Sequence, residues 1–299
     1  MPSASSLAEA SEALAAAHAE GRRIRIGEDL TTEGLDRVLE HEAGDLTCTV
    51  EAGIRLSALN TALARYGQRL SLDPPGNPTV GALLAGNASG PLRHRFGAPR
   101  DLVLGVTLVL ADGTVASAGG KVVKNVAGYD LARLICGSRG RLALIARASF
   151  RLHPLPKAAQ TLVVETEDAP HAVAALLRSQ LQPSAFDILH PGRLAILFEG
   201  AERAVEAQIA AAHDLVAGAT ADTDVWEESR RRQGAARGRM LFDPGRLGAV
   251  LAQLDEAVVR PSAGVAYVPH EVPADIPEGF QRLVEAIRGE LDPRGVLAA

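Results

Sequence analysis

The chain has 299 residues, of which 47% are hydrophobic and 22% charged, so it can bury one large or two ordinary globular cores. Its formal net charge of −5 gives no reason to expect nucleic acid or an anionic membrane as a partner. No stretch approaches the roughly 20 apolar residues of a membrane span, and the N-terminus lacks the basic and apolar regions of a signal peptide.

The first part of the chain alternates expected helices and strands. A capping box at Ser6–Glu9 begins a helix, and residues 22–26 have the alternation of a short strand. A loop, Gly27-Glu28-Asp29-Leu30, follows this strand. Alternation at 46–50 predicts a half-buried strand, and leucines at helical spacing predict a helix over 56–66.

The stretch from Asp73 to Pro156 organises the chain, because glycines and small residues separate its apolar segments. Thr79 is the expected N-cap of a short helix through Ala85, whose free amides would suit a phosphate. Residues 102–110 read as a strand before a hairpin turn, and 142–153 as a long one-faced strand. Each glycine alone is better explained by a turn, but four such segments together predict a backbone cradle for a large flat ligand.

Pro154-Leu155-Pro156 marks the expected boundary between two domains, residues 1–156 and 157–299. Beyond it the order strand, helix, strand, strand, helix suggests an α+β layer of ferredoxin-like type. These elements are expected at 161–165, 170–179, 185–189, 194–199 and 202–216. The remaining expected elements are a strand at 239–242, a helix at 247–258, a strand at 263–268 and a helix at 281–290.

Four glycine-rich segments carry a resemblance to a known family. They are Pro-Thr-Val-Gly-Ala-Leu-Leu-Ala-Gly-Asn-Ala-Ser-Gly-Pro (78–91), Arg-Phe-Gly-Ala-Pro-Arg-Asp-Leu-Val-Leu-Gly-Val (95–106), Gly-Gly-Lys-Val-Val-Lys-Asn-Val-Ala-Gly-Tyr-Asp-Leu-Ala-Arg-Leu (119–134) and Gly-Ser-Arg-Gly-Arg-Leu-Ala-Leu (137–144). In this order they resemble the FAD-binding domain shared by p-cresol methylhydroxylase (PCMH) and vanillyl-alcohol oxidase, and most closely the FAD-binding subunits of bacterial glycolate oxidase. The resemblance covers 46–156; beyond it, only the closing Asp-Pro-Arg-Gly is similar to the end of these flavoproteins.

The resemblance implies an α+β fold, with a two-lobed PCMH-type FAD-binding domain (1–156) and a small ferredoxin-like α+β cap domain (157–299) that covers the flavin. It also implies which residues line the cofactor. Those implied cofactor-binding residues are Pro74, Thr79, Val80, Gly81, Ala82, Asn87, Ala88, Ser89, Gly90, Gly97, Asp101, Gly128, Tyr129, Gly140, Leu142 and Ile145.

The sequence departs from the family in its pyrophosphate loop, where Gly27-Glu28-Asp29-Leu30 replaces a glycine-rich motif. Two carboxylates facing a pyrophosphate would repel it by roughly a few kcal/mol, so either the loop turns away or FAD binding is weakened. Ala82, Arg141 and Ala143 also stand where the family often has Gly, Thr and Gly. The loop holds no histidine, so FAD is expected to bind non-covalently.

Oxidation of a 2-hydroxy acid needs a base and cations near the flavin. Catalytic relatives carry a His-x-x-Gly-Asp-Gly-Asn type of motif, which this chain lacks, and its C-terminal histidines are scattered. His94, beside the flavin-side segment, is expected to be a polar rim residue. No catalytic residue and no metal ligand is therefore assigned.

The resemblance then implies an FAD-binding oxidoreductase subunit of a glycolate (2-hydroxy acid) oxidase or dehydrogenase complex in glyoxylate metabolism. The implied partners are a larger flavin subunit, which carries out the hydride chemistry, and an iron–sulfur subunit. Two alternatives stay open: a free-standing FAD oxidoreductase of a small hydroxy acid, and a scaffold subunit that has lost FAD.

Lys121, Lys124 and Tyr129 either stabilise negative charge on a flavin or face a partner, or they belong to a loop held only by Tyr129 packing and an Asp130 cap. Cys48 and Cys136 have no metal or redox spacing, which favours a reducing compartment. A cytoplasmic location is expected, with peripheral attachment to the inner membrane through partners as the alternative.

Overall fold

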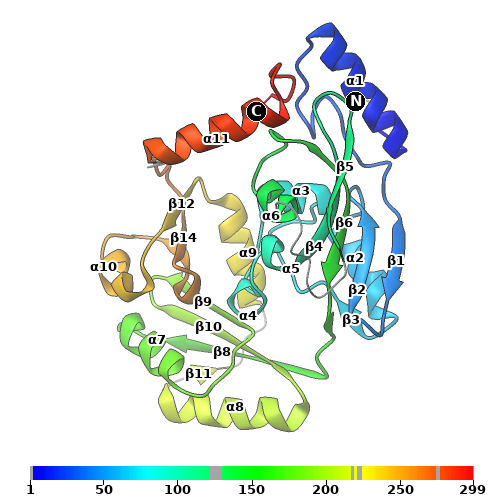
Figure 1. Cartoon of the computed structure of the whole chain (residues 1–299). Coiled ribbons are helices and arrows are strands. Elements are labelled where there is room, and N and C mark those ends of the chain that lie inside the picture. Colours follow the sequence, from blue (N-terminus) through cyan, green and yellow to red (C-terminus); the bar gives the residue numbers. More distant parts are fainter. Residues whose placement is uncertain (1–2, 121–129, 217–218, 221–223, 274–276, 299) are drawn as a thin grey trace.

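The computed structural model describes residues 3–120, 130–216, 219–220, 224–273 and 277–298, and two large antiparallel sheets organise them (Figure 1). The first sheet has the order β1-β2-β6-β4-β5. Its strands are β1 (Val38–Glu42), β2 (Thr47–Glu51), β4 (Val103–Val109), β5 (Val115–Gly119) and β6 (Leu144–Arg151), and a ribbon of β3 (Gln68–Arg69) and β7 (His153–Pro154) lies beside them.

Six helices lie in the first half of the described chain, and α4 among them contacts the second sheet. They are α1 (Leu7–Glu20), α2 (Leu56–Ala64), α3 (Val80–Gly86), α4 (Arg93–Phe96), α5 (Pro99–Leu102) and α6 (Leu131–Ile135). The two N-cap predictions are confirmed, because the Ser6 side chain accepts from the Glu9 amide and Thr79 caps α3. The capping box is only half formed, since the Glu9 carboxylate accepts from the Ser5 amide at 2.8 Å and not from that of Ser6. The long strand expected at 142–153 is present as β6.

The second sheet has seven strands in the order β11-β8-β10-β9-β13-β14-β12. Its strands are β8 (Ala158–Glu165), β9 (Ala185–His190), β10 (Arg193–Gly200), β11 (Ala219–Thr220), β12 (Gly238–Leu241), β13 (Ala257–Arg260) and β14 (Val265–Val268). The helices of this half are α7 (Ala169–Arg178), α8 (Glu202–Leu215), α9 (Val225–Ala235), α10 (Leu247–Leu251) and α11 (Glu278–Leu291), with 3₁₀ turns η1 (Pro244–Arg246) and η2 (Pro261–Ala263).

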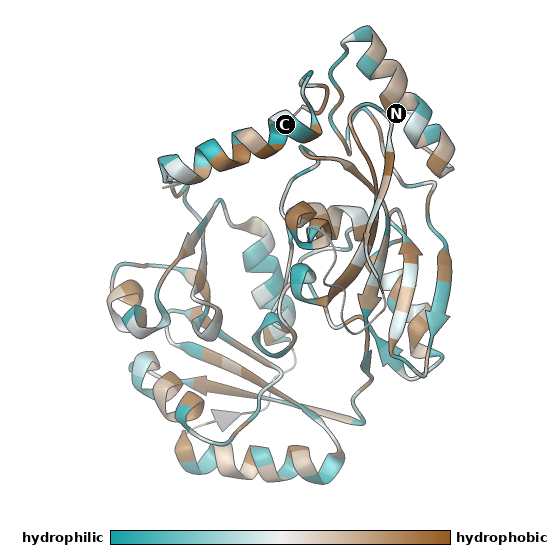
Figure 2. Cartoon of the chain, in the orientation of Figure 1, coloured by the Kyte–Doolittle hydropathy of each residue, from teal (hydrophilic) through white to brown (hydrophobic). Residues whose placement is uncertain are grey.

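The expected strand–helix–strand–strand–helix order runs from β8 to α8, and β13, β14 and β12 extend the sheet beyond four strands. One face packs against α7, α8 and α10; α8 is hydrophobic on the side toward the sheet (Figure 2) and buries Val205, Ile209 and Ala212 there. The opposite face contacts α9 and α4. That this half caps a flavin, and that the boundary falls after Pro156, stay predictions.

Two expected elements are wrong in part. Residues 22–26 form only single bridges, because Ile24 pairs with Leu297 of the C-terminal segment whereas Ile26 pairs with Leu30 of the adjoining loop, so no continuous partner strand lies beside them. The helix expected over 247–258 ends at Leu251, and β13 begins at Ala257. The helix ends early because the following residues pair in the sheet. Strand β13 lies between β9 and β14 with all four residues buried, and its two valines suit such a central strand.

The C-terminal segment returns to the N-terminal domain (Figure 1). Val296 and Leu297 are buried in a cluster with Leu14 of α1 and with Ile24. The core of the first domain therefore contains residues from both ends of the chain.

Candidate functional site

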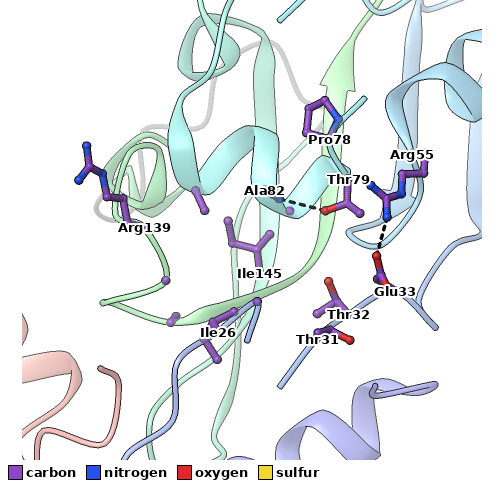
Figure 3. A pocket seen from close by; sticks show the side chains of 15 residues that line it. Ile26, Thr31, Thr32, Glu33, Arg55, Pro78, Thr79, Ala82, Arg139 and Ile145 are labelled. Carbon is purple, nitrogen blue, oxygen red and sulfur yellow. Dashed lines mark hydrogen bonds and ion pairs between the residues drawn. The ribbon is translucent and has the colours of Figure 1, made fainter. Parts of the chain in front are cut away.

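A cavity of about 420 Å³ opens in the first domain, between the N-terminal end of α3 and the start of β6 (Figure 3). Residues from 26–33, 78–85 and 139–145 line it, together with Arg55 from the N-cap of α2. Segments far apart in the sequence thus meet at one site whose size falls in the usual range for small-molecule ligands.

Three glycines keep backbone, rather than side chains, at the cavity wall. Gly27 has φ +94°, and no atom lies within 4 Å of the position where its Cβ would be. A Cβ on Gly81 would lie 3.2 Å from the Ala52 Cβ, and one on Gly140 (φ +76°) would lie 3.0 Å from the Ile26 Cβ. Gly81 and Gly140 therefore let neighbouring segments of the wall pack together, and Gly27 leaves open space in which a ligand can approach the main chain.

The amides at the start of α3 are already bonded, so the expectation that they are free for a phosphate is wrong. The Val80 amide donates to the Ile54 carbonyl (2.9 Å) and the Gly81 amide to the Ala52 carbonyl (2.6 Å). The Ala82 amide donates to Thr79 Oγ1 at 3.2 Å. The cause is that α3 begins directly against residues 52–54, so a ligand must find its donors elsewhere.

Two arginines supply positive charge on opposite sides of the cavity (Figure 3). Arg55 Nη2 lies 2.6 Å from Glu33 Oε1, and its side chain is half exposed. The Arg139 guanidinium has no ion pair within the described part of the chain. Two guanidiniums against one carboxylate leave the site with a net positive charge, which suits a diphosphate group.

The carboxylates of the 27–30 loop do not face this cavity. Arg25 Nη1 lies 2.5 Å from Glu28 Oε2, and Arg25 Nε lies 3.2 Å from Asp29 Oδ2. Neither acidic residue lines the cavity wall. Hydrogen bonds from Arg25 hold the pKa of Asp29 below its usual range. Of the two alternatives left by the sequence, the structure has the loop turned away.

Five of the residues implied by the resemblance meet in this cavity, namely Thr79, Gly81, Ala82, Gly140 and Ile145. Others do not line it: Val80 and Leu142 belong to the hydrophobic core, whereas Pro74, Asn87, Ala88, Ser89 and Gly90 lie before and after α3. Gly128 and Tyr129, with Lys121 and Lys124, lie outside the described residues.

Gly97 and Asp101 form a local turn rather than part of the cavity. Asp101 Oδ2 accepts from the Ala98 amide at 2.8 Å, and a Cβ on Gly97 would lie 2.7 Å from the same oxygen. Asp101 lines a second cavity of about 620 Å³, which also involves Arg69 and Glu199.

The sequence reasoning missed several lining residues, among them Thr31, Thr32, Arg55 and Arg139. Arg139 had a signal, since it directly precedes Gly140 in the Gly-Ser-Arg-Gly motif. Arg55 had none, because it reaches the cavity from the start of a different helix.

His94 is partly buried rather than a simple rim residue. Its Nδ1 lies 2.7 Å from Ser262 Oγ, and burial lowers the pKa of its imidazole. Among the described residues, no group of three or more His, Cys, Asp or Glu side chains could hold a metal ion. No helix in the same ranges is long and apolar enough to cross a bilayer.

Comparison with known proteins defines the class to which this site belongs. Residues 25–119 match a family model described as "FAD binding domain". Two solved structures of alkyldihydroxyacetonephosphate synthase share the fold over 99% of this chain and 74–75% of theirs, with TM-scores of 0.74 and 0.75 at 15–16% identity. The chain carries an FAD-binding domain of the PCMH type, and the family recognised in the sequence is confirmed.

The sequence relatives are more specific. The chain is 32% identical to glycolate oxidase subunit GlcE of Escherichia coli over 70% of its own length and 61% of that protein. It is 37% identical to a D-lactate dehydrogenase of Archaeoglobus fulgidus over 54% of its length and 37% of that protein. The chain therefore spans less than two thirds of either relative.

FAD is thus the cofactor of this domain, and the cavity residues fit it. The open space beside Gly27 admits a ligand against the main chain, and the two arginines match a pyrophosphate. The methyl groups of Ala82 and Ala143, which stand where the family often has glycine, line the cavity without closing it.

Proposed function

We propose that this chain is the FAD-binding subunit of a complex that oxidises glycolate or a similar small 2-hydroxy acid. In this proposal, hydride transfer from the substrate takes place on a larger flavin-binding partner, and an iron–sulfur subunit accepts the electrons. The similarity to GlcE supports the subunit assignment. The observation that carries the FAD part is the cavity, with its backbone wall and its two arginines.

FAD, when bound, supplies two-electron redox chemistry at its flavin ring. The chain's own residues hold and shield it. Arg55 and Arg139 bind the pyrophosphate charge, and Thr31 and Thr32 offer hydroxyl groups beside them. Ile26 and Ile145 provide an apolar wall that excludes water from one side of the cofactor.

A second candidate is a free-standing FAD oxidoreductase of a small hydroxy acid, which the similarity to D-lactate dehydrogenase favours. The two candidates differ in turnover. The purified chain with an artificial electron acceptor should not oxidise glycolate or D-lactate if it is a subunit, whereas steady turnover by the chain alone would establish the free-standing enzyme.

FAD binding is tested by the visible spectrum of the purified chain, with acid-released flavin counted per protein. About one non-covalent FAD per chain is expected. The variant Ala82→Leu extends an exposed first-turn side chain into the cavity. It should weaken FAD binding at least about tenfold, or about 1.4 kcal/mol, with little change in apoprotein stability, because Leu and Ala have similar helix propensities.

Ala210→Leu is the matched control, because it makes the same change at an exposed position of α8, away from the cavity. A colourless protein that takes up no added FAD would contradict the proposal and favour the scaffold alternative. Equal FAD affinity in both variants would place the cofactor elsewhere.

A further inference from the structure

A backbone carbonyl just beyond the C-terminal end of α3 is held by side chains of the C-terminal half. Ser89 is 2% exposed, and its carbonyl accepts a hydrogen bond from Gln233 Nε2 of α9 at 2.8 Å. Arg260 Nη1, at the end of β13, approaches the same oxygen at 3.4 Å. Two side chains of the C-terminal half thus converge on one main-chain atom of the N-terminal domain.

The two donors are fixed in turn by a buried network. Arg260 is 1% exposed and its Nε donates to Asp187 Oδ1 at 3.2 Å, while its Nη2 donates to Gln233 Oε1 at 2.6 Å. Ser229 donates to the second Asp187 oxygen at 2.5 Å. A buried guanidinium and carboxylate cannot leave each other without a large desolvation cost, so the network has one geometry.

The segment that receives these bonds is equally constrained. Asn87 ends α3 in the left-handed conformation (φ 46°), and its amide donates to the Leu84 carbonyl at 3.0 Å. Gly90 packs so closely on Asp73 that a Cβ there would lie 1.8 Å from the Asp73 carbonyl oxygen. Residues 87–90 therefore connect the network directly to the C-terminal end of α3.

Helix α3 forms one wall of the cofactor cavity through Thr79, Gly81, Ala82 and Ala85. Its inner face packs Val80, Leu83 and Leu84 into the core. Because it is only seven residues long, contacts at its two ends add to this packing in fixing its position. Its N-terminal end is bonded to 52–54, and its C-terminal end is continuous with the segment at Ser89.

We propose that Gln233 and Arg260 are positioning residues for the FAD site: by holding the Ser89 carbonyl they fix 87–90 and α3, and they couple cofactor binding in the first domain to the C-terminal half. This inference rests on the proposed function, since it assumes that the cavity beside α3 binds FAD.

The test is Gln233→Leu, which removes the shorter of the two hydrogen bonds to the Ser89 carbonyl and the acceptor of Arg260 Nη2, and leaves the Arg260–Asp187 ion pair in place. The matched control is Arg69→Met, which breaks another contact between the two halves, the ion pair of Arg69 with Glu199 at 2.6 Å. Two quantities are measured: the Kd for FAD by titration of the apoprotein, and hydrogen exchange of the amides of 83–90 without FAD.

Gln233→Leu should raise the Kd for FAD at least tenfold and speed exchange of the Asn87 and Ala88 amides, which bond to carbonyls of α3. Arg69→Met should change the Kd less than threefold and leave this exchange unaltered. An unchanged Kd in Gln233→Leu would overturn the proposal, as would an equal rise in both variants. If the wild-type chain binds no FAD, the proposed function fails, and the exchange comparison alone then decides whether Gln233 holds this segment.

Discussion

Asp73 places a carboxyl group at the junction between the two halves of the chain. One of its oxygens accepts from the Leu92 amide at 3.0 Å, and the other lies 3.7 Å from Arg230 Nη1, with the side chain 19% exposed. Burial raises the pKa of this carboxyl to about 7, and the opposing effect of Arg260 and Arg230 does not cancel it. Asp187 adds a smaller upward effect.

Asp73 should therefore make stability depend on pH. Because its folded pKa exceeds its ordinary value of 3.8, the folded state retains the proton between about pH 4 and pH 7 and the unfolded state does not. Its contribution to stability thus falls as pH rises through this range, by up to about 1.4 kcal/mol per pH unit, and is constant above it. Asp73→Asn should remove this slope.

The measurement is urea unfolding of the apoprotein between pH 4.5 and 8. Asp101→Asn serves as the control, because Asp101 also accepts a backbone amide but stands in an exposed turn. Identical slopes in the wild type and in Asp73→Asn would show that the Asp73 carboxyl does not carry this dependence.

Cavity residues could be predicted from the sequence where the signal lies in the neighbouring residues. Thr79, Gly81 and Gly140 could be read from the sequence, because a cap and glycines beside apolar segments have one-dimensional signatures. The bonds of the Val80 and Gly81 amides could not, since their acceptors at 52–54 lie more than twenty residues earlier. The pairing of Glu28 and Asp29 with Arg25 had both partners within four residues, yet which way the loop faces depends on tertiary packing.

At the scale of elements, the closing Asp-Pro-Arg-Gly segment acts as a clip after α11. Asp292 is 5% exposed, and its two oxygens accept from the Val296 and Leu297 amides, each at 2.8 Å. Residues 296–298 then bond on both sides of Ile24, through the Ile24 amide (2.7 Å) and its carbonyl (2.9 Å). Gly27 of the cavity follows three residues later, so the clip supports the loop that lines the FAD site.

Asp292→Ala should destabilise the chain by about 2–3 kcal/mol, since two backbone amides lose a charged acceptor in a buried setting. It should also increase hydrogen exchange of the Ile24 amide. Asp292→Asn keeps one acceptor oxygen and should give an intermediate loss in the same denaturant titration. If Asp292→Ala and the wild type unfold at the same urea concentration, the clip contributes nothing to stability.

The same segment explains where element prediction failed. The order of helices and strands was readable from β8 to α8 because each element has its own period and its own turns. Residues 22–26 alternate as a strand does, but Ile24 pairs with the C-terminal tail and Ile26 with Leu30, so they share no one partner strand and only single bridges form. Likewise, the helix expected over 247–258 overlaps the first two residues of β13, which form a strand because they pair between β9 and β14.

For the whole molecule, the two halves expected from the sequence are not joined only at residue 156. The Arg69–Glu199 ion pair and the network at Ser89 cross between them, and Leu92 and Phe96 of the first half pack with Trp226 of the second. The tail from 292 completes the core around α1. Folding of the N-terminal domain should therefore depend on residues beyond the proposed boundary.

A fragment of residues 1–156 tests this dependence. It lacks Val296 and Leu297, so Leu14 and Ile24 lose buried apolar contacts, and Leu92 becomes exposed at the former junction. Because small domains are only marginally stable, the fragment should melt without a cooperative transition and should not take up FAD. A synthetic peptide of residues 277–298, added in trans, should restore part of the transition, whereas the same peptide with Asp292→Ala should not. A fragment that melts sharply on its own would mean that the tail packs on a domain already complete, and the FAD site would then be built by the first half of the chain alone.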